Sequence, residues 1–231
     1  MKNSKIKGVI FDLDNTLLDF MSMKSFAIKA GIKGMIEAGL PLDSSLAYEK
    51  IISIYECKGY EYQKVFDDFI VNETNDTNYK VLASGISAYR KAREASLALY
   101  PNVNSTLIKL IKMGLLLGVV SDAPSREAWM RICQLNLHHI FDSVVTFNDT
   151  GVTKPSSEPF EKICKNLDVI PEEALMLGDW PERDVVGTKK VGMRTAFARY
   201  GDTFDTINSN ADYDIDDISE LIDIIKKENI N

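Results

Sequence analysis

Short runs of hydrophobic and β-branched residues alternate with amphipathic helical patterns along most of the chain. Five such runs predict buried strands, and polar residues follow the first four of them directly. The runs span residues 8–11, 115–120, 143–147, 174–177 and 194–198. Between them, apolar residues recur at helical spacing, as at Val103, Leu107 and Leu110. Strands and helices in this order predict an α/β fold with a doubly wound parallel sheet.

The alternation is interrupted after the first strand. From residue 20 to residue 99 no convincing strand is found, and apolar residues recur at the spacing of helix faces, as at Ile28, Ile32 and Met35. We therefore predict two domains. Residues 1–19 and 100–231 form an α/β core domain, and residues 20–99 form a small all-helical domain inserted into it.

The charge balance argues against some classes of partner. The 231 residues include 34 acidic and 27 basic side chains, which gives a formal net charge of −7, and 45% are hydrophobic. This composition fits a soluble globular protein whose average field repels nucleic-acid phosphates and anionic lipids. A small anionic substrate would need positive charge supplied locally. The acidic stretch at residues 212–217 is interpreted as a solvated loop before a C-terminal amphipathic helix.

The cysteines and the hydropathy bear on the compartment. The three cysteines are widely spaced and form no Cys-x-x-Cys pair, which argues against a disulfide framework and against a thiolate zinc site. No stretch approaches the ~20 apolar residues of a membrane span, and the N-terminus does not resemble a secretory signal. We expect a cytoplasmic protein without a membrane partner. The sequence leaves open whether it is a monomer or a homodimer.

The polar residues at the strand ends carry the candidate chemistry, because the carboxyl ends of parallel strands converge at one edge of a sheet. These residues are Asp12, Asp14 and Thr16 after the first strand, Ser121 and Asp122 after the second, Lys154 after the third, and Asp179 and Asp184 after the fourth. Several carboxylates, a hydroxyl, an ammonium group and backbone amides suit Mg²⁺-assisted phosphoryl transfer. Alternative interpretations stay open: Asp179 or Ser121 could cap a helix, and Lys154 could be a surface lysine.

The same residues resemble the four ordered motifs of the haloacid dehalogenase (HAD) superfamily. They are Asp12-Leu13-Asp14-Asn15-Thr16, Ser121, Lys154-Pro155, and Gly178-Asp179 with Asp184. The helical insertion is similar to the cap domain of the dehalogenase-like and phosphoglycolate-phosphatase-like members. The stretches 178–184 and 198–204 look most like archaeal capped members, a group of mostly small-molecule phosphatases.

The resemblance implies a role for each residue. Asp12 would be the nucleophile that forms an aspartyl-phosphate, and Asp14 the general acid and then the general base. Mg²⁺ would be held by the carboxylates of Asp12 and Asp179 and by the backbone carbonyl of Asp14. Ser121, the amide of Asp122 and Lys154 would bind the phosphoryl oxygens. Thr16 would brace the loop, and Asp184 would orient a metal-bound water or Lys154.

We therefore predict an Mg²⁺-dependent phosphomonoester hydrolase of a small phosphorylated metabolite, with a phosphosugar or triose phosphate suggested by the resemblance. Phosphomutase and phosphonatase activity on the same core remain alternatives, and the second would need a cap lysine, for which Lys24, Lys29 and Lys33 are available. A phospho-acceptor or binding protein without turnover is a further alternative, disfavoured by Asp14. Haloacid dehalogenation is disfavoured because the chain keeps both Asp14 and Asp179.

Overall fold

The computed structural model describes residues 4–230. Residues 1–3 and 231, which the sequence pattern assigns to the core domain, lie outside the described residues. Two compact units are present, one formed by residues 4–19 and 98–230 and the other by residues 20–97. Ala98 and Leu99, placed in the helical domain by the sequence pattern, lie in the first unit, where Leu99 forms an antiparallel bridge with Leu18.

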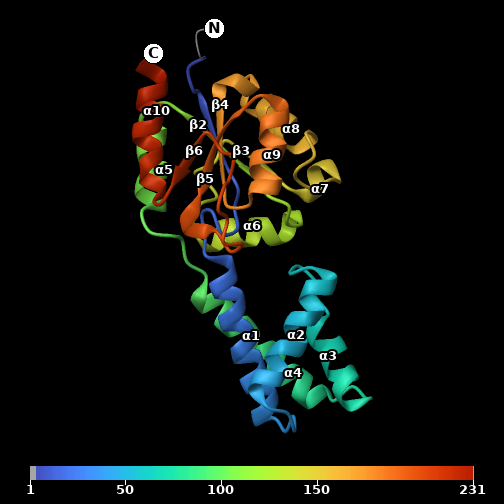
Figure 1. The fold of residues 1–231 in the computed structure, drawn as a ribbon. Helices are drawn as coiled ribbons and strands as arrows, with labels where there is room; N and C mark the ends of the chain where they lie inside the picture. The colour runs from blue at the N-terminus through green and yellow to red at the C-terminus, as the bar shows by residue number, and fades with distance from the viewer. Residues whose placement is uncertain (1–3, 231) are drawn as a thin grey trace. The chain divides into compact units, whose positions relative to one another are not determined.

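The first unit, called the core unit below, is built on a six-stranded parallel sheet with the strand order β3-β2-β1-β4-β5-β6 (Figure 1). The strands are β1 (Gly8–Phe11), β2 (Leu116–Val120), β3 (Ser143–Val145), β4 (Ala174–Gly178), β5 (Arg194–Ala198) and β6 (Tyr213–Ile215). Strand β1 is buried throughout and lies between β2 and β4. The predicted doubly wound parallel sheet is confirmed, and the loop after β1 lies centrally at its carboxyl edge.

Helices cover both faces of this sheet. Figure 1 shows α5 and α10 on one face and α8 and α9 on the other. The apolar face of α8 packs on the sheet through Phe160 and Ile163, which join the buried strand residues Ile10 and Met176 in one cluster. The helices of the core unit are α5 (Val103–Lys112), α6 (Ser125–Gln134), α7 (Phe147–Thr150), α8 (Glu158–Leu167), α9 (Val186–Val191) and α10 (Leu221–Ile230), with short helical turns at Pro171–Glu173, Pro181–Val185, Arg199–Gly201 and Ile218–Glu220.

One strand of the core unit was not predicted. The stretch 212–217, interpreted as a loop, contains the edge strand β6, which pairs in parallel with β5. Ile215 of this strand is buried, and the carboxylate of Asp214 accepts hydrogen bonds from Arg199 and Ser209. Because Arg199 neutralises this carboxylate, β6 accommodates an aspartate, a residue type that is depleted in strands.

The third predicted strand is shorter than its hydrophobic run. It ends at Val145 instead of Phe147, because Thr146 caps the short helix α7. The backbone N–H of Thr146 donates to Asp149 at 2.8 Å, and its hydroxyl donates to the same carboxylate at 2.7 Å. This capping starts a helix directly after the strand.

The second unit, called the helical unit below, consists of α1 (Phe20–Glu37), α2 (Ser44–Lys58), α3 (Val65–Thr74) and α4 (Tyr79–Ser96). Its own core is formed by residues such as Ile28, Ile51 and Phe69, all buried. Helices α1 and α4 approach each other closely at Gly34, where an added Cβ would lie only 2.9 Å from the carbonyl oxygen of Ser84.

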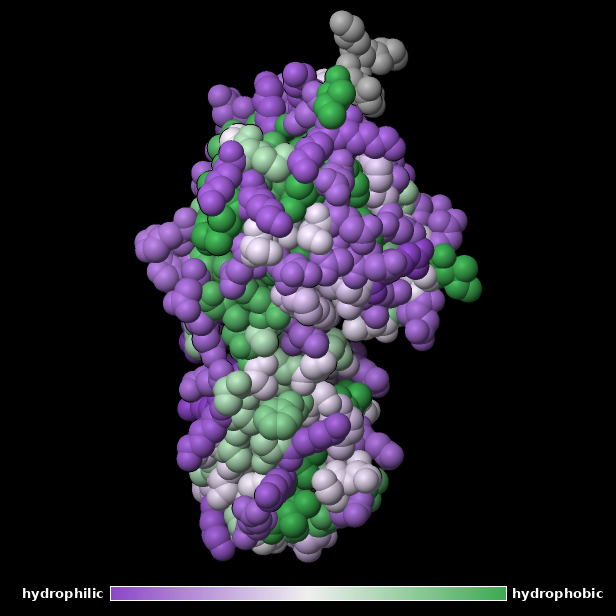
Figure 2. Space-filling view, turned by 90° about the vertical axis from the view of Figure 1, so that its left-hand side faces the viewer, coloured by the Kyte–Doolittle hydropathy of each residue, from purple (hydrophilic) through white to green (hydrophobic). Residues whose placement is uncertain are grey.

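The surface is mixed in character. On the face shown in Figure 2, hydrophilic residues cover much of the molecule and hydrophobic residues are interspersed among them. Within residues 4–230, none of the helices combines the length and the hydropathy that crossing a membrane requires.

Candidate active site

The loop after β1 presents two acidic residues at the carboxyl edge of the sheet. The backbone N–H of Asp12 donates to the carbonyl of Leu177 at 2.8 Å, which extends the β1–β4 pairing by one residue. Asn15 adopts a left-handed conformation with a φ of 59°, and its N–H donates to the carbonyl of Leu18 at 2.7 Å. Asparagine tolerates this conformation better than most residues. The chain therefore turns back directly after Asp14.

A turn at residues 199–201 braces this loop. The hydroxyl of Tyr200 donates to the carbonyl of Thr16 at 2.9 Å, and the Tyr200 ring packs edge-on against Tyr100. Gly201 approaches so closely that a Cβ on it would lie 1.7 Å from the carbonyl oxygen of Asn15. Only a residue without a side chain fits there, so the position of the loop depends on this contact.

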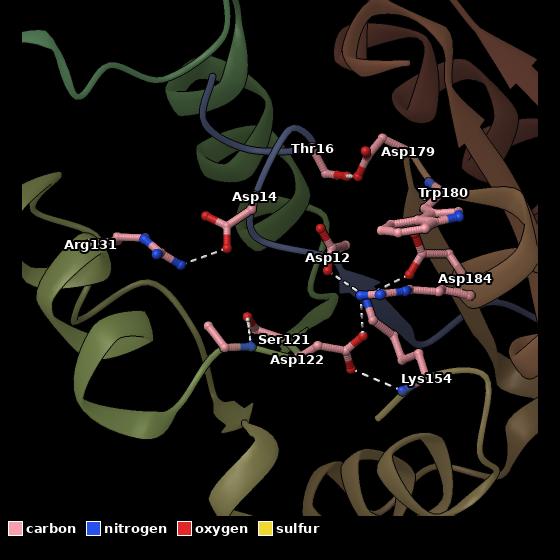
Figure 3. A network of polar contacts seen from close by, with 12 residues as sticks. Asp12, Asp14, Thr16, Ser121, Asp122, Arg131, Lys154, Asp179, Trp180 and Asp184 are labelled. Carbon is pink, nitrogen blue, oxygen red and sulfur yellow. Dashed lines mark hydrogen bonds and ion pairs between the residues drawn. The ribbon is translucent and has the colours of Figure 1, made fainter. Parts of the chain in front are cut away.

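Lys154 lies between two carboxylates (Figure 3). Its ammonium group donates to Oδ1 of Asp12 and to Oδ1 of Asp184, the second at 2.6 Å. All three residues are buried. The backbone N–H of Trp180 donates to Oδ2 of Asp184 at 3.0 Å, and a Cβ on Gly178 would lie 2.3 Å from the carboxyl carbon of Asp184. Lys154 is therefore an internal counterion, not a surface lysine.

The residues after β2 hold the backbone of Lys154 in place. Oδ1 of Asp122 accepts the backbone N–H of Lys154 at 2.9 Å, and Oδ2 of Asp122 accepts Nη1 of Arg183 at 3.1 Å. The buried hydroxyl of Ser121 accepts the backbone N–H of Ala123 at 3.2 Å. Ser121 thus supports its own loop and does not cap α6, which begins at Ser125.

Burial and like charge shift the pKa values of these groups. Burial raises the pKa of Asp12 from 3.8 to about 7, while Lys154 opposes the shift and Asp184 adds to it. Burial and the charges of Asp12 and Asp184 raise the pKa of Asp179 well above its ordinary value. Burial lowers the pKa of Lys154, but the two carboxylates that it contacts outweigh this effect and raise it. The site therefore holds more buried negative charge than Lys154 compensates.

Asp14 lies on the side of Asp12 opposite to Lys154. Its Oδ2 accepts Nη1 of Arg131 at 2.6 Å. Figure 3 shows this pair across Asp12 from Lys154 and Asp184. The two acidic residues of the loop after β1 therefore have different cationic partners, Lys154 and Arg131, and different surroundings allow two carboxylates to take different chemical roles.

Residues 9–198 match the family model of haloacid dehalogenase-like hydrolases. The chain belongs to this family. It is 34% identical over 224 residues to a glyceraldehyde 3-phosphate phosphatase of Methanocaldococcus jannaschii, which covers 96% of this chain and 97% of the relative. It is 32% identical over 228 residues to the glyceraldehyde 3-phosphate phosphatase of Pyrococcus furiosus, with 97% and 95% covered. The crystal structure of a HAD phosphatase from Thermococcus onnurineus aligns with a TM-score of 0.71 and 26% identity over 95% of this chain and 98% of that chain.

The predicted resemblance to HAD hydrolases is thereby confirmed, and the structure places the motif residues as follows. Direct polar contacts join Lys154 to Asp12, Asp184 and Asp122, and join Thr16 to Asp179. Asp14 pairs with Arg131, and the hydroxyl of Ser121 accepts a bond within its own loop.

Four residues at this site of the HAD hydrolase were not among the predicted ones: Arg131, Arg183, Tyr200 and Gly201. The guanidinium of Arg183 stacks on the ring of Trp180, with its central carbon 3.7 Å from the ring centroid. The sequence spacing could have identified Arg131, because this residue lies on the same face of α6 as the buried residues Ala128 and Ile132. A charged residue on a buried helix face usually has a buried partner.

The donor set fits the Mg²⁺ that HAD phosphatases generally use. Three buried carboxylates share one buried ammonium here, so a divalent cation would relieve their repulsion. Within residues 4–230, no group of three or more His, Cys, Asp or Glu side chains is arranged to hold a metal ion. Mg²⁺ readily takes one or two carboxylates and completes its shell with carbonyl oxygens and waters. Asp12 and Asp179 with the Asp14 carbonyl would meet that need.

Proposed function

We propose that this HAD hydrolase cleaves the phosphate monoester of a triose phosphate, with glyceraldehyde 3-phosphate as the first candidate substrate. The observation that carries the proposal is the buried contact of Lys154 with Asp12 and Asp184, beside a second acidic residue, Asp14. One site thus contains a nucleophilic carboxylate, Asp12, held by Lys154, and a separate acid/base carboxylate, Asp14. The relatives named glyceraldehyde 3-phosphate phosphatase, matched over nearly their full lengths, support the substrate class.

The first half-reaction forms an aspartyl-phosphate. Oδ of Asp12 attacks phosphorus as the bond between phosphorus and the ester oxygen breaks, and Asp14 gives a proton to the leaving oxygen. The contact with Lys154 favours the ionised form of Asp12, which is the nucleophilic form. Ser121, the amide of Asp122 and Lys154 stabilise the charge on the phosphoryl oxygens.

The second half-reaction restores Asp12. Asp14, now ionised, takes a proton from a water molecule whose oxygen attacks phosphorus, and inorganic phosphate leaves. Asp12 and Asp179 with the Asp14 carbonyl would hold Mg²⁺, which supplies positive charge to the phosphoryl group. Asp184 holds Lys154 in position through the 2.6 Å contact, and Thr16 holds Asp179 at 3.0 Å.

A panel of phosphate esters tests the proposal. Phosphate release is measured from glyceraldehyde 3-phosphate, dihydroxyacetone phosphate, glycerol phosphate, phosphoglycolate, pyrophosphate and 4-nitrophenyl phosphate, with Mg²⁺ and with a chelator. We expect the highest kcat/KM for a triose phosphate and loss of activity with the chelator. A blank without enzyme corrects for the spontaneous elimination of phosphate from triose phosphates. Absence of turnover on every ester, or turnover that survives chelation, would contradict the proposal.

Phosphonatase activity is less compatible with the surroundings of the candidate lysines. Lys24 is the buried one of the three, and its ammonium group donates to the carbonyl of Tyr60 at 2.8 Å. It also lies 4.2 Å from the centroid of the Tyr55 ring. A cation over an aromatic face favours the charged ammonium, whereas a lysine that forms a Schiff base must be neutral.

Replacing Gly201 with Ala is expected to lower kcat by roughly 10-fold to 100-fold, because displacement of reacting groups by about 1 Å can cost that much. The new Cβ would lie 1.7 Å from the carbonyl oxygen of Asn15, so the loop after β1 must move. Gly8→Ala is the matched control, since its Cβ would meet its nearest atom at 3.7 Å. Phosphate release at saturating substrate measures both variants. Wild-type kcat in Gly201→Ala would show that the brace has no catalytic importance.

Mg²⁺ is expected to stabilise the fold more at high pH than at low pH. The pKa of Asp12 is raised from 3.8 to about 7 in the folded state, so its contribution to stability is present below the ordinary value and is lost as pH rises through about 7. Mg²⁺ binds the ionised carboxylate and should offset that loss. We expect a larger increase in Tm on adding Mg²⁺ at about pH 8 than at about pH 5.

Thermal unfolding followed by circular dichroism, with Mg²⁺ or with chelator, measures this effect. In Asp12→Asn the group that titrates is removed, so the difference between the two pH values should shrink. An equal or larger shift at the lower pH would mean that protons and Mg²⁺ do not compete at Asp12.

A further inference from the structure

Arg131 is a buried arginine on helix α6 that neither the family motifs nor the proposed reaction uses. Its side chain is 10% exposed, and its Nη1 donates to Oδ2 of Asp14 at 2.6 Å, across 117 residues of sequence. Both residues belong to the core unit. Figure 3 shows the Asp14 carboxylate directed toward Arg131 and not toward the cluster around Lys154.

The helix that carries Arg131 is fixed at its start. The backbone N–H of Ser125 donates to Oδ1 of Asn148 at 2.8 Å, and the hydroxyls of Ser125 and Thr146 lie 2.6 Å apart. The helix follows the loop after β2, and β2 pairs directly with β1, whose loop carries Asp14. The ion pair therefore joins helix α6, which follows β2, to the loop after the neighbouring strand β1.

The burial of Arg131 is costly for a purely structural residue. Arg131 lies on the buried face of α6, next to Ile132 in the chain, whereas the side chain of Arg126 on the same helix is 82% exposed. Taking a guanidinium out of water carries a large penalty that only a well-placed carboxylate offsets, and an apolar residue at such a position is often equally stable. A role in the site explains why a charge is placed there.

We propose that Arg131 is a positioning residue that holds the carboxylate of Asp14 in the orientation from which it transfers protons. This inference rests on the proposed function, in which Asp14 gives a proton to the leaving oxygen and later takes one from water. The contact at Oδ2 restricts rotation of the Asp14 side chain, and the planar guanidinium fixes its direction. Arg131 also offers a partner to the carboxylate that forms when the proton leaves.

Leaving-group dependence tests the inference. Arg131→Gln should lower kcat for glycerol phosphate, whose leaving oxygen needs a proton, by about tenfold or more, with little change in KM. With 4-nitrophenyl phosphate the leaving group needs no proton. The burst of nitrophenolate should therefore keep the wild-type rate, while steady turnover falls because attack by water still needs Asp14. General damage to the site would slow the burst as well.

A double-mutant cycle makes the test specific. In the Asp14→Asn background, Arg131→Gln should cost no further activity, because the group that it positions no longer transfers protons. Arg126→Gln, on the exposed face of the same helix, should behave as wild type. Arg131→Lys keeps the charge without the planar fork and should recover only part of kcat, which provides a second variant if Arg131→Gln does not fold.

The outcomes separate the inference from the function on which it rests. Wild-type kcat in Arg131→Gln, a burst slowed as much as turnover, or additive losses with Asp14→Asn would each overturn the positioning role alone. Full activity of Asp14→Asn would overturn the acid/base role of Asp14, and no turnover of any ester by the wild type would overturn the proposed function. Either result would overturn the inference with it.

Discussion

Asp12→Asn is expected to reduce phosphate release from every ester that the wild type hydrolyses by at least about 10³-fold. An amide of nearly the same size and shape replaces the carboxylate, but it cannot form the acyl phosphate. The residue is buried and its backbone N–H still extends the β1–β4 pairing, so the fold should remain. Removing one of several buried like charges also relieves repulsion with Asp179 and Asp184.

Two measurements check this expectation. Steady-state phosphate release gives the loss of rate, and acid quenching of wild type with radiolabelled substrate should trap a phosphoprotein that hydroxylamine cleaves, as expected for an acyl phosphate. The variant should give no label. Asp223→Asn, the same substitution at a side chain that is 86% exposed, is the control and should keep wild-type activity. Label retained in Asp12→Asn would place the nucleophile on another residue.

Sequence patterns predicted the parts of the fold that depend on buried runs. The central strands β1, β2 and β4 are continuous apolar segments covered on both faces, so burial alone identifies them. Strand β5 begins with Arg194 and Thr195, but its last three residues are apolar and buried. Strand β6 escaped prediction because its middle residue, Asp214, is acidic and is neutralised by Arg199, a contact between side chains that no local pattern reveals.

The residues of the candidate site also fall into those that the sequence predicts and those that depend on packing. Asp12, Ser121, Lys154 and Asp179 could be predicted because strand ends in a parallel sheet converge, whatever the exact packing. The place of Arg131 on the buried face of α6 could also be predicted. Its pairing with Asp14 and the contact of Gly201 with Asn15 could not, because they depend on the rotation of a helix and on the path of a turn. A sequence gives the spacing of residues along α6, but which of its faces meets Asp14 is decided by packing in the core unit.

Lys154→Met is expected to destabilise the fold by about 3–5 kcal/mol, because it leaves buried carboxylates without their counterion. The ammonium contacts Asp12 and Asp184, and Asp184 is only 2% exposed and closely packed against Gly178. Water cannot readily replace the lost charge there. Lys226→Met removes an exposed ion pair, in which Nζ of Lys226 lies 3.2 Å from Oδ1 of Asp223, and should change stability by less than about 1 kcal/mol.

The loss of stability in Lys154→Met should be largest at pH values at which the buried carboxylates are ionised. Urea unfolding of Lys154→Met at rising pH is expected to show stability falling further below wild type, since protonation at low pH removes the uncompensated charge. Adding Asp184→Asn to Lys154→Met should recover part of the stability but none of the phosphatase activity, because the phosphoryl group still lacks its ammonium partner. If the double variant were no more stable than Lys154→Met, uncompensated charge at Asp184 would not be the cause, and the lysine would stabilise the core through its packing instead.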